Sequence, residues 1–225
     1  AATLADAGFD GLMIENFGDA PFFPDEVPPI TVASMTRAAT AIRAAIDLPV
    51  GINVLRNDAI SAVSIAAAVG AEYVRVNVLS GTMYTDQGPI VGKAAEVARL
   101  RAVVGPEVAI FADVFVKHAV PPAGMTLEQA AEELTGRGGA DAVIASGTAT
   151  GKAPSLVHIK ETKAAVGDLP LYIGSGASAV TARSFLEAAD GLIAADHEVD
   201  DGHYAVVLQP MLNALAATVA EASRA

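Results

Sequence analysis

The sequence predicts a (β/α)8 barrel whose first strand is absent from the chain. Three observations carry this prediction: apolar runs alternate with helical stretches, the strands begin in two alternating ways, and polar residues gather where strands end. Runs rich in β-branched residues between amphipathic stretches of helical length indicate repeated βα units and a parallel sheet. A chain of 225 residues with 52% hydrophobic residues suits one such domain, and we expect it to span residues 1–225.

The expected strands are short apolar runs, as is typical of strands that are covered on both faces. They are Gly11–Asn16, Val50–Leu55, Tyr73–Leu79, Val108–Val116, Ala142–Ser146, Leu171–Gly174 and Leu192–Ala195. The helices between them show the helical period. One predicted apolar stripe consists of Met35, Ala38, Ala39, Ile42 and Ile46. Thr126 and Gln129 have the spacing of a capping box at a helix start, and Asn57 and Asp58 can cap another helix.

The residues that precede the strands alternate strictly between two types. Four strands follow a small residue and an acid: Asp10, Glu72, Asp141 and Asp190 are these acids. The three strands between them follow Pro49, Pro106 and Pro170. Glycine and proline both end helices, so the alternation marks an internal repeat of two βα units. The repeat predicts eight strands, with one proline-type strand before residue 1. The alternative is an open doubly wound sheet, which rarely keeps such a repeat.

Composition excludes several function classes. The net charge of −12 disfavours nucleic acid and anionic membrane surfaces as partners, and there is no basic patch. No window is long and apolar enough for a membrane span. The absence of cysteine excludes disulfides, thiol chemistry and cysteine-ligated metals, and it fits a cytoplasmic protein. We expect a homo-oligomer that acts on a small-molecule substrate, without a cofactor.

Polar residues follow the ends of the predicted strands, which is where functional groups lie in a barrel. They include Glu15, Asn16, Asp19, Asn53, Arg56, Arg75, Asn77, Asp113, Lys117, His118 and Ser146. Period-two geometry places Arg75 and Asn77 on the interior face of their strand, and Asp113 and Lys117 likewise share a face. A buried arginine must be paired, and Glu15 or Asp113 can pair with Arg75. The alternative to a functional site is a satisfied polar layer of the core.

Two glycine-containing loops can bind an anion. Gly174, Ser175 and Gly176 follow a strand and precede a helix capped near Ser178, so their backbone could hold a phosphate; the alternative is a tight turn without a ligand. The segment from Gly147 to Lys152 lacks the spacing of a nucleotide-binding P-loop but contains the donors Thr148 and Thr150.

Lys117 and an acidic run near the end of the chain allow further chemistry. Lys117 in apolar surroundings could form a Schiff base, although pairing with Asp113 is the more economical interpretation. The run 196–203 contains Asp196, His197, Glu198, Asp200, Asp201 and His203 and could hold a divalent cation. A solvated loop is the commoner explanation of such a run, and we assign no metal ligand.

Several of these segments resemble the BtpA family over nearly the whole chain. The matching segments are Glu15–Phe22, Gly51–Asp58, Val74–Asn77, Ala112–Val114 with Lys117 and His118, Gly147–Gly151 and Gly174–Gly176. The resemblance implies a TIM barrel related to the phosphate-binding group. Family members include proteins tied to photosystem I assembly and others that look like enzymes of carbohydrate or nucleotide metabolism. The family's usual Val-His pair in a first strand is absent, and the segment after Asp190 departs from the family pattern.

Two hypotheses follow for the function. The first is an enzyme, a lyase, isomerase or hydrolase that acts on a small polar or phosphorylated metabolite at the barrel mouth. Asp113 would be the acid/base, Lys117 would stabilise negative charge and Glu15 would be a second carboxylate. The substrate-binding residues would be Asn16, Asp19, Asn53, Arg75, Asn77, His118, Thr148 and Thr150, with Gly174, Ser175 and Gly176 for phosphate. The second hypothesis is a non-catalytic factor in photosystem I assembly or membrane biogenesis, with Phe17, Phe22 and Phe23 as a docking patch.

Overall fold

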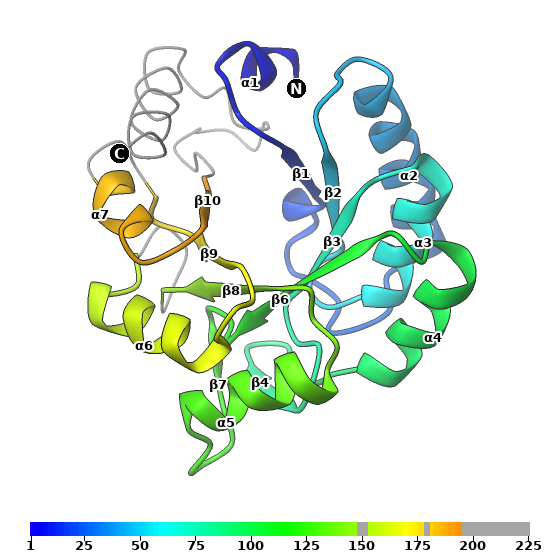
Figure 1. Ribbon diagram of the computed structural model, residues 1–225. Coiled ribbons are helices and arrows are strands. Elements are labelled where there is room, and N and C mark those ends of the chain that lie inside the picture. Colours follow the sequence, from blue (N-terminus) through cyan, green and yellow to red (C-terminus); the bar gives the residue numbers. More distant parts are fainter. Residues whose placement is uncertain (148–152, 178–180, 195–225) are drawn as a thin grey trace.

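The chain folds around one parallel sheet with helices on its outer side. The computed structural model describes residues 1–147, 153–177 and 181–194. Within these residues the sheet has seven parallel strands, in the order β1-β2-β3-β6-β8-β9-β10. They are β1 (Leu12–Glu15), β2 (Val50–Asn53), β3 (Tyr73–Val76), β6 (Ala109–Val114), β8 (Ala142–Ser146), β9 (Leu171–Gly174) and β10 (Gly191–Ile193). Figure 1 shows these strands around a common centre, which is the predicted barrel architecture.

The helices connect successive strands on the outer side of the sheet (Figure 1). They are α1 (Ala2–Asp6), η1 (Phe17–Asp19), α2 (Pro29–Arg43), α3 (Ala59–Val69), α4 (Ala94–Val104), α5 (Leu127–Glu132), η2 (Glu133–Arg137), α6 (Leu156–Val166) and α7 (Ala182–Leu186). The capping box of Thr126 and Gln129 is confirmed at the start of α5. Asp58 caps α3, as predicted, by accepting from the backbone N–H of Ser61. The prediction for Ala38 is wrong, because this residue of α2 is exposed.

The seven predicted strands are confirmed: β8 and β9 have the predicted bounds, β1, β2, β3 and β6 are shorter, and β10 begins one residue earlier, while Ala195 lies outside the described residues. The strand expected before residue 1 is not among the described strands, and β1 and β10 form the two edges of this sheet. A second, three-stranded sheet was not predicted. It consists of β5 (Gly88–Val91), β4 (Thr82–Thr85) and β7 (Ala119–Val120), and it packs through Met83 and Ile90 against Val78 and Val116.

The alternating starts of the strands have a structural cause at the amino-terminal face of the sheet. Each of three acids accepts a hydrogen bond from the backbone N–H of a residue in the preceding strand. The pairs are Glu72 with Val50, Asp141 with Ile110 and Asp190 with Leu171, each at 2.8 Å. The same acids pair with basic residues in or near the last turns of α2, α4 and α6: Arg43, Arg101 and Lys163. The repeated acid therefore has a structural role. Lying just before one strand, it binds the start of the preceding strand and the end of the helix that leads into that preceding strand.

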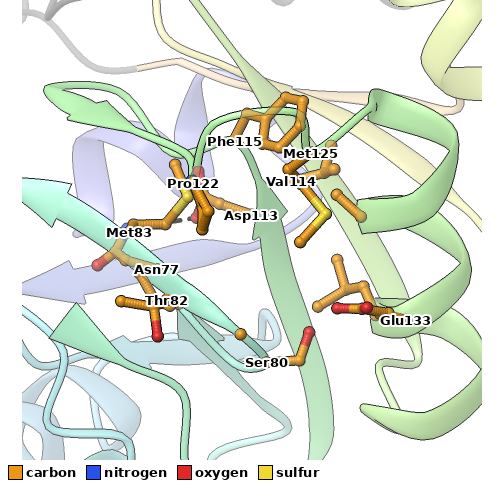
Figure 2. A pocket seen from close by; sticks show the side chains of 14 residues that line it. Asn77, Ser80, Thr82, Met83, Asp113, Val114, Phe115, Pro122, Met125 and Glu133 are labelled. Atoms are coloured by element: carbon orange, nitrogen blue, oxygen red, sulfur yellow. Dashed lines mark hydrogen bonds between the residues drawn. The ribbon is translucent and has the colours of Figure 1, made fainter. Parts of the chain in front are cut away.

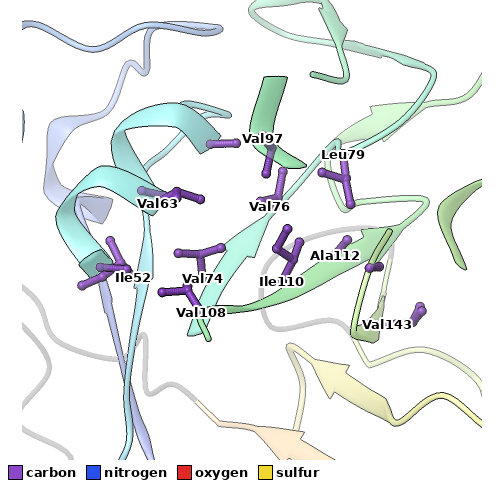
Figure 3. Close-up of a cluster of buried hydrophobic side chains, with 14 of the residues drawn as sticks. Ile52, Val63, Val74, Val76, Leu79, Val97, Val108, Ile110, Ala112 and Val143 are labelled. Atoms are coloured by element: carbon purple, nitrogen blue, oxygen red, sulfur yellow. The ribbon is translucent and has the colours of Figure 1, made fainter. Parts of the chain in front are cut away.

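The hydrophobic core lies between the sheet and the helices. Side chains such as Ile52, Val74, Ile110 and Val143 are less than 2% exposed and belong to one buried cluster that also includes Val63 of α3 (Figure 3). Burial at about 25 cal/mol per Å2 of apolar surface makes this layer the main source of stability.

Residues between these core positions point to the barrel interior, because side chains alternate along a strand. In the interior, Phe111 stacks between Tyr73 and Tyr172 at ring-centroid distances of 4.9 Å. Gly51 makes room for this stack, since a Cβ there would lie 2.1 Å from the Tyr73 ring. The polar side chains described next lie nearer the carboxyl ends of the strands.

Candidate functional site

An ion-paired arginine lies at the centre of the polar layer in the barrel interior. The guanidinium of Arg75 donates to both carboxylate oxygens of Asp113, at 2.9 and 2.8 Å. It also donates to Glu15 at 3.4 Å. Because β1, β3 and β6 are parallel, the ends that carry Glu15, Arg75 and Asp113 meet at one side of the sheet. The predicted pairing of Arg75 with Glu15 or Asp113 is confirmed for both carboxylates.

Arg75 and Asp113 neutralise one another in an enclosed environment. The side chains are 5% and 0% exposed, respectively. Burial alone would lower the pKa of Arg75, but the charge and hydrogen bonds of Asp113, helped by Glu15, outweigh it and raise the pKa. Arg75 is therefore a permanent cation whose position is determined by Asp113. Glu15, with a side chain 26% exposed, is the more accessible of the two carboxylates.

Three neutral side chains complete the network around Asp113. Asn77 donates to Asp113 at 3.3 Å and Ser146 donates at 2.9 Å. Asn53 donates to the backbone oxygen of Arg75 and to Asn77 Oδ1, while its own Oδ1 is buried without a partner among the described residues. With four donors at one carboxylate, the polar layer has an almost complete set of hydrogen bonds. Sequence reasoning had not assigned Ser146 a role, although its place at a strand end was a sufficient cue.

Lys117 reaches from the segment after β6 to the turn after β9. Its Nζ donates to Ser175 Oγ at 3.1 Å. The predicted pairing of Lys117 with Asp113 is wrong, because Arg75 occupies Asp113 and no ion pair of Lys117 occurs within the described residues. Burial and the positive charge of Arg75 lower the pKa of Lys117, against weaker opposing effects of Glu15 and Asp113. The structure thus joins the predicted catalytic lysine to the predicted phosphate-binding turn.

Arg56 and His118 flank Lys117. Arg56 is 5% exposed and donates to the backbone oxygen of Lys117 at 2.6 Å. Burial lowers the pKa of Arg56, although Asp113 and Asp86 oppose this effect. Burial and the neighbouring cations Lys117 and Arg56 lower the pKa of His118, which favours the neutral imidazole. The sequence pattern alone assigns Arg56 no role, although its position just after a strand places it among the polar residues at the strand ends.

Two asparagines connect successive strand ends instead of pointing their polar groups at a free surface. Asn16 accepts from the backbone N–H of Leu55 at 2.7 Å and donates to its carbonyl oxygen at 3.3 Å. It also donates to Asp19, which lies in η1. Asn57, expected as a helix cap, instead makes the same two bonds to Val78. These amides hold the rim of the barrel in register.

Some predicted site residues lie outside the described part of the chain. These are Thr148, Thr150 and the acidic run 196–203. Over residues 1–147, 153–177 and 181–194, no group of three or more histidine or acidic side chains has the geometry of a metal site. Gly174 is the last residue of β9 and Ser175 follows it. Gly176 packs closely on Ala153, since a Cβ at Gly176 would lie 2.4 Å from the Ala153 backbone nitrogen.

A small cavity reaches Asn77 and Asp113 from the side of the three-stranded sheet. Figure 2 shows Met83 of β4, Pro122 and Met125 around it, with Glu133 at its edge. Its volume of about 40 Å3 is enough for a water molecule but far below that of a metabolite site. This cavity is therefore too small to hold a metabolite.

The fold and site define a TIM-barrel-like α/β protein with an ion-paired polar layer below a lysine at the barrel mouth. The chain belongs to the BtpA family, whose model matches residues 1–212. The photosystem I biogenesis protein BtpA of Synechocystis is 44% identical over 94% of this chain and 74% of that protein. An uncharacterized protein of Methanocaldococcus jannaschii is 49% identical over 86% of this chain and 72% of that protein.

Solved structures with low sequence identity share the fold. A structure described as native KDPGal superposes with a TM-score of 0.65 at 14% identity and covers 100% of this chain and 88% of that one. N-(5'-phosphoribosyl)anthranilate isomerase from Pyrococcus furiosus gives 0.60 at 13% identity, with coverages of 98% and 94%. Orotidine 5'-phosphate decarboxylase from Pyrococcus horikoshii gives 0.61 at 15%, with coverages of 97% and 90%. At such identities the likeness shows the fold alone. Among the described helices, none has the length and apolar character needed to cross a membrane.

Proposed function

We propose that the protein is an enzyme that acts on a small phosphorylated metabolite, of the sugar or nucleotide type, at the mouth of the barrel. The observation that carries this proposal is the 3.1 Å contact between Lys117 and Ser175. It places a cation without a carboxylate partner in the described residues beside a turn of the kind that binds phosphate. The names of two structural relatives, a phosphoribosylanthranilate isomerase and an orotidine phosphate decarboxylase, are consistent with such a substrate.

The local charge supports an anionic substrate. Three cations, Arg56, Arg75 and Lys117, lie close together with the carboxylates Glu15 and Asp113, with Asp86 also acting on Arg56, in a chain whose net charge is −12. An anion binds to a mostly acidic protein only where positive charge is concentrated locally in this way. Because Arg75 is already paired with Asp113, Lys117 and Arg56 would supply most of the attraction.

The proposed roles follow from accessibility. Lys117 stabilises negative charge that develops on the substrate, and Glu15, as the more accessible carboxylate, transfers protons. Asp113 was the predicted acid/base. Its carboxylate is enclosed and accepts hydrogen bonds from four donors, which favours a positioning role. In this role Asp113 keeps Arg75 where it can contact Glu15 and the substrate. Lyase, isomerase and hydrolase reactions are all compatible with these groups.

The remaining predicted binding residues divide into direct and indirect roles in this proposal. Asn53 has an unused acceptor, and His118 is exposed beside Lys117, so both are proposed to contact the substrate. Asn16, Asp19 and Asn77 are proposed to act indirectly, since each is engaged with other residues of the site or its rim. Gly174, Ser175 and Gly176 are proposed to hold the phosphate.

Calorimetry with inorganic phosphate and with sugar phosphates tests the proposal. Lys117→Met should weaken binding about 10- to 100-fold, because a charge-assisted hydrogen bond to an anion contributes about 1.5–3 kcal/mol. The matched control is Lys160→Met, which removes a lysine of α6 far from the turn in sequence and should leave the affinity unchanged. Equal affinities of the two variants for phosphate, or no phosphate binding by the unmodified protein, would refute the proposal.

A second candidate function is that of an assembly factor. The Synechocystis relative is called a photosystem I biogenesis protein, and Phe17 and Phe23 are 43% and 55% exposed here. The ring of Phe17 also lies 6.2 Å from that of Phe22, and exposed aromatic side chains are common at protein interfaces. Phe23→Ser would then abolish co-purification of a partner, whereas Val157→Ser, at a 65% exposed site, would not. Phosphate binding at the mouth together with no partner in such an experiment would count against this function.

The compartment and the oligomeric state belong to the same proposal. We propose a cytoplasmic homo-oligomer, and sedimentation of the purified protein together with cell fractionation tests both parts. A monomer at micromolar concentration, or recovery with the membranes, would contradict the corresponding part.

A further inference from the structure

Lys117 is unusual among the lysines whose side chains the structure describes. Lys93 pairs with Asp25, Lys163 pairs with Asp190, and Lys160 is exposed to solvent, whereas Lys117 is partly buried. Lys117 instead has only a neutral hydroxyl as its hydrogen-bond partner in the described part of the chain, and the neighbouring carboxylate of Asp113 is engaged with Arg75. The amine is therefore held in place without a carboxylate in ion-pair contact among the described residues.

The surroundings of Lys117 lower the pKa of its amine, so that a larger fraction of the amine is neutral than in an ordinary lysine. The ionisable groups that act on it are Arg75 and Arg56, which disfavour its charge, and Glu15 and Asp113, which favour it. Together with burial these groups give the amine a pKa below its ordinary value. A neutral lysine amine is a nucleophile, whereas an ammonium ion is not. The half-buried side chain at the mouth remains within reach of a ligand.

We propose that Lys117 forms an imine with the carbonyl carbon of a small phosphorylated aldehyde or ketone. The proposal deepens the proposed function and rests on it for the position of the phosphate. The nitrogen lone pair forms the new C–N bond while the carbonyl π electrons move to oxygen. Both hydrogens of the neutral amine leave with that oxygen as water, and the imine nitrogen then takes up one proton.

The geometry also limits the size of the substrate. A phosphate oxygen that accepts from Ser175 Oγ lies within a few ångströms of Lys117 Nζ, because these two protein atoms are 3.1 Å apart. A chain of only a few carbon atoms spans such a separation between phosphate and carbonyl carbon. The substrate class is therefore a short phosphorylated carbonyl compound, and not a nucleotide with a distant reactive group.

An imine at this position gives a specific chemical advantage. The protonated nitrogen accepts the electron pair that is released when a bond to the adjacent carbon breaks, and the pair returns when a proton or carbon is added there. Glu15, the accessible carboxylate of the same layer, is suited to move that proton. Of the reaction classes compatible with the site, this favours a lyase or an isomerase over hydrolysis of a glycosyl bond.

Borohydride trapping tests the inference on the full chain. The protein is incubated with glycolaldehyde phosphate at neutral pH and reduced with sodium borohydride, and the modified lysines are mapped by peptide mass spectrometry. We expect Lys117 to carry most of the label, with less on Lys93, Lys160 and Lys163, because its lowered pKa raises the neutral fraction of its amine and the Ser175 turn holds the phosphate of the probe beside it. Lys117→Arg keeps a positive charge but should lose the adduct, and Lys160→Met should keep it.

Two further arms separate this inference from the proposed function. Glycolaldehyde without phosphate should label Lys117 more weakly, and inorganic phosphate should compete with the phosphorylated probe. Even labelling of all lysines overturns the imine, and the proposed function survives that result if calorimetry still shows phosphate binding that depends on Lys117. Preferential labelling of Lys117 that phosphate does not displace supports the imine and contradicts the phosphate site. The mapping on the unmodified protein decides the matter even if Lys117→Arg fails to fold.

Discussion

Replacing Asp113 by asparagine should be strongly destabilising, because it leaves the guanidinium of Arg75 buried without its main countercharge. Arg75 is 5% exposed and Asp113 is fully enclosed, so water cannot replace the lost carboxylate. Only Glu15, at 3.4 Å, would remain as a partner. The new amide would also present hydrogens to the guanidinium hydrogens, and donors do not pair with donors.

The expected cost is about 3–5 kcal/mol, the range for breaking a buried ion pair by removing one partner. This is a large part of the about 5–15 kcal/mol that stabilises a typical domain. With an m-value of about 3 kcal/mol/M, the urea midpoint should fall by about 1–2 M. Equilibrium urea unfolding at 25 °C, followed by circular dichroism, measures this change.

Matched variants distinguish the effect of breaking the buried ion pair from the effect of removing any carboxylate. Asp141→Asn removes a carboxylate that is 45% exposed and pairs with Arg101, so it should cost only about 1 kcal/mol. The double variant Asp113→Leu with Arg75→Met removes both charges and should recover much of the stability that Asp113→Asn loses. If Asp113→Asn costs no more than Asp141→Asn, or if the double variant is less stable than Asp113→Asn, the account of the polar layer is refuted.

Two further outcomes are expected. Gly51→Ala should destabilise the fold by about 1–3 kcal/mol and lower Tm by several degrees, because its Cβ would overlap the Tyr73 ring. Gly18→Ala should be nearly neutral, because no atom lies within 4 Å of the added Cβ. Equal melting temperatures of the two variants would contradict this packing. Hydrogen bonds to Leu171 N–H and Lys163, against the opposing effect of burial, lower the pKa of Asp190 below 3.8. The stabilisation of the fold by Asp190 should therefore be complete above about pH 4 and vanish as the pH falls through the lowered pKa. The difference in unfolding free energy between the native chain and Asp190→Asn should shrink on acidification. A difference that grows in acid would contradict this expectation.

The strands could be predicted because local sequence is sufficient to define them. A run such as Val50–Leu55 is apolar on both faces and follows a proline, so its pairing partners do not need to be known. The same local information located Asp58 and Thr126 as helix caps. The three-stranded sheet was missed because its packing depends on contacts with Val78 and Val116, which follow the ends of other strands and are not adjacent to it in pattern.

The candidate site was only partly predictable. Period two along one strand placed Arg75 and Asn77 on the interior face, and a buried arginine requires a carboxylate, so the pairing with Glu15 and Asp113 followed. Two cations in the sequence, Arg75 and Lys117, could each have paired with Asp113. Only the three-dimensional distances show that Arg75 does so.

The sequence by itself determined the parallel α/β architecture, the repeat and the end of the barrel at which polar groups gather, because these depend on periodicity and on residues adjacent in the chain. The tertiary structure decided which charges meet. The contact of Lys117 with Ser175 joins residues 58 positions apart, and that of Arg56 with the Lys117 backbone joins residues 61 positions apart. Such contacts depend on how neighbouring strands align and on which cation lies within hydrogen-bond distance of each carboxylate. The unpaired amine at the mouth is therefore a consequence of the fold, since Arg75 takes the only enclosed carboxylate of the polar layer.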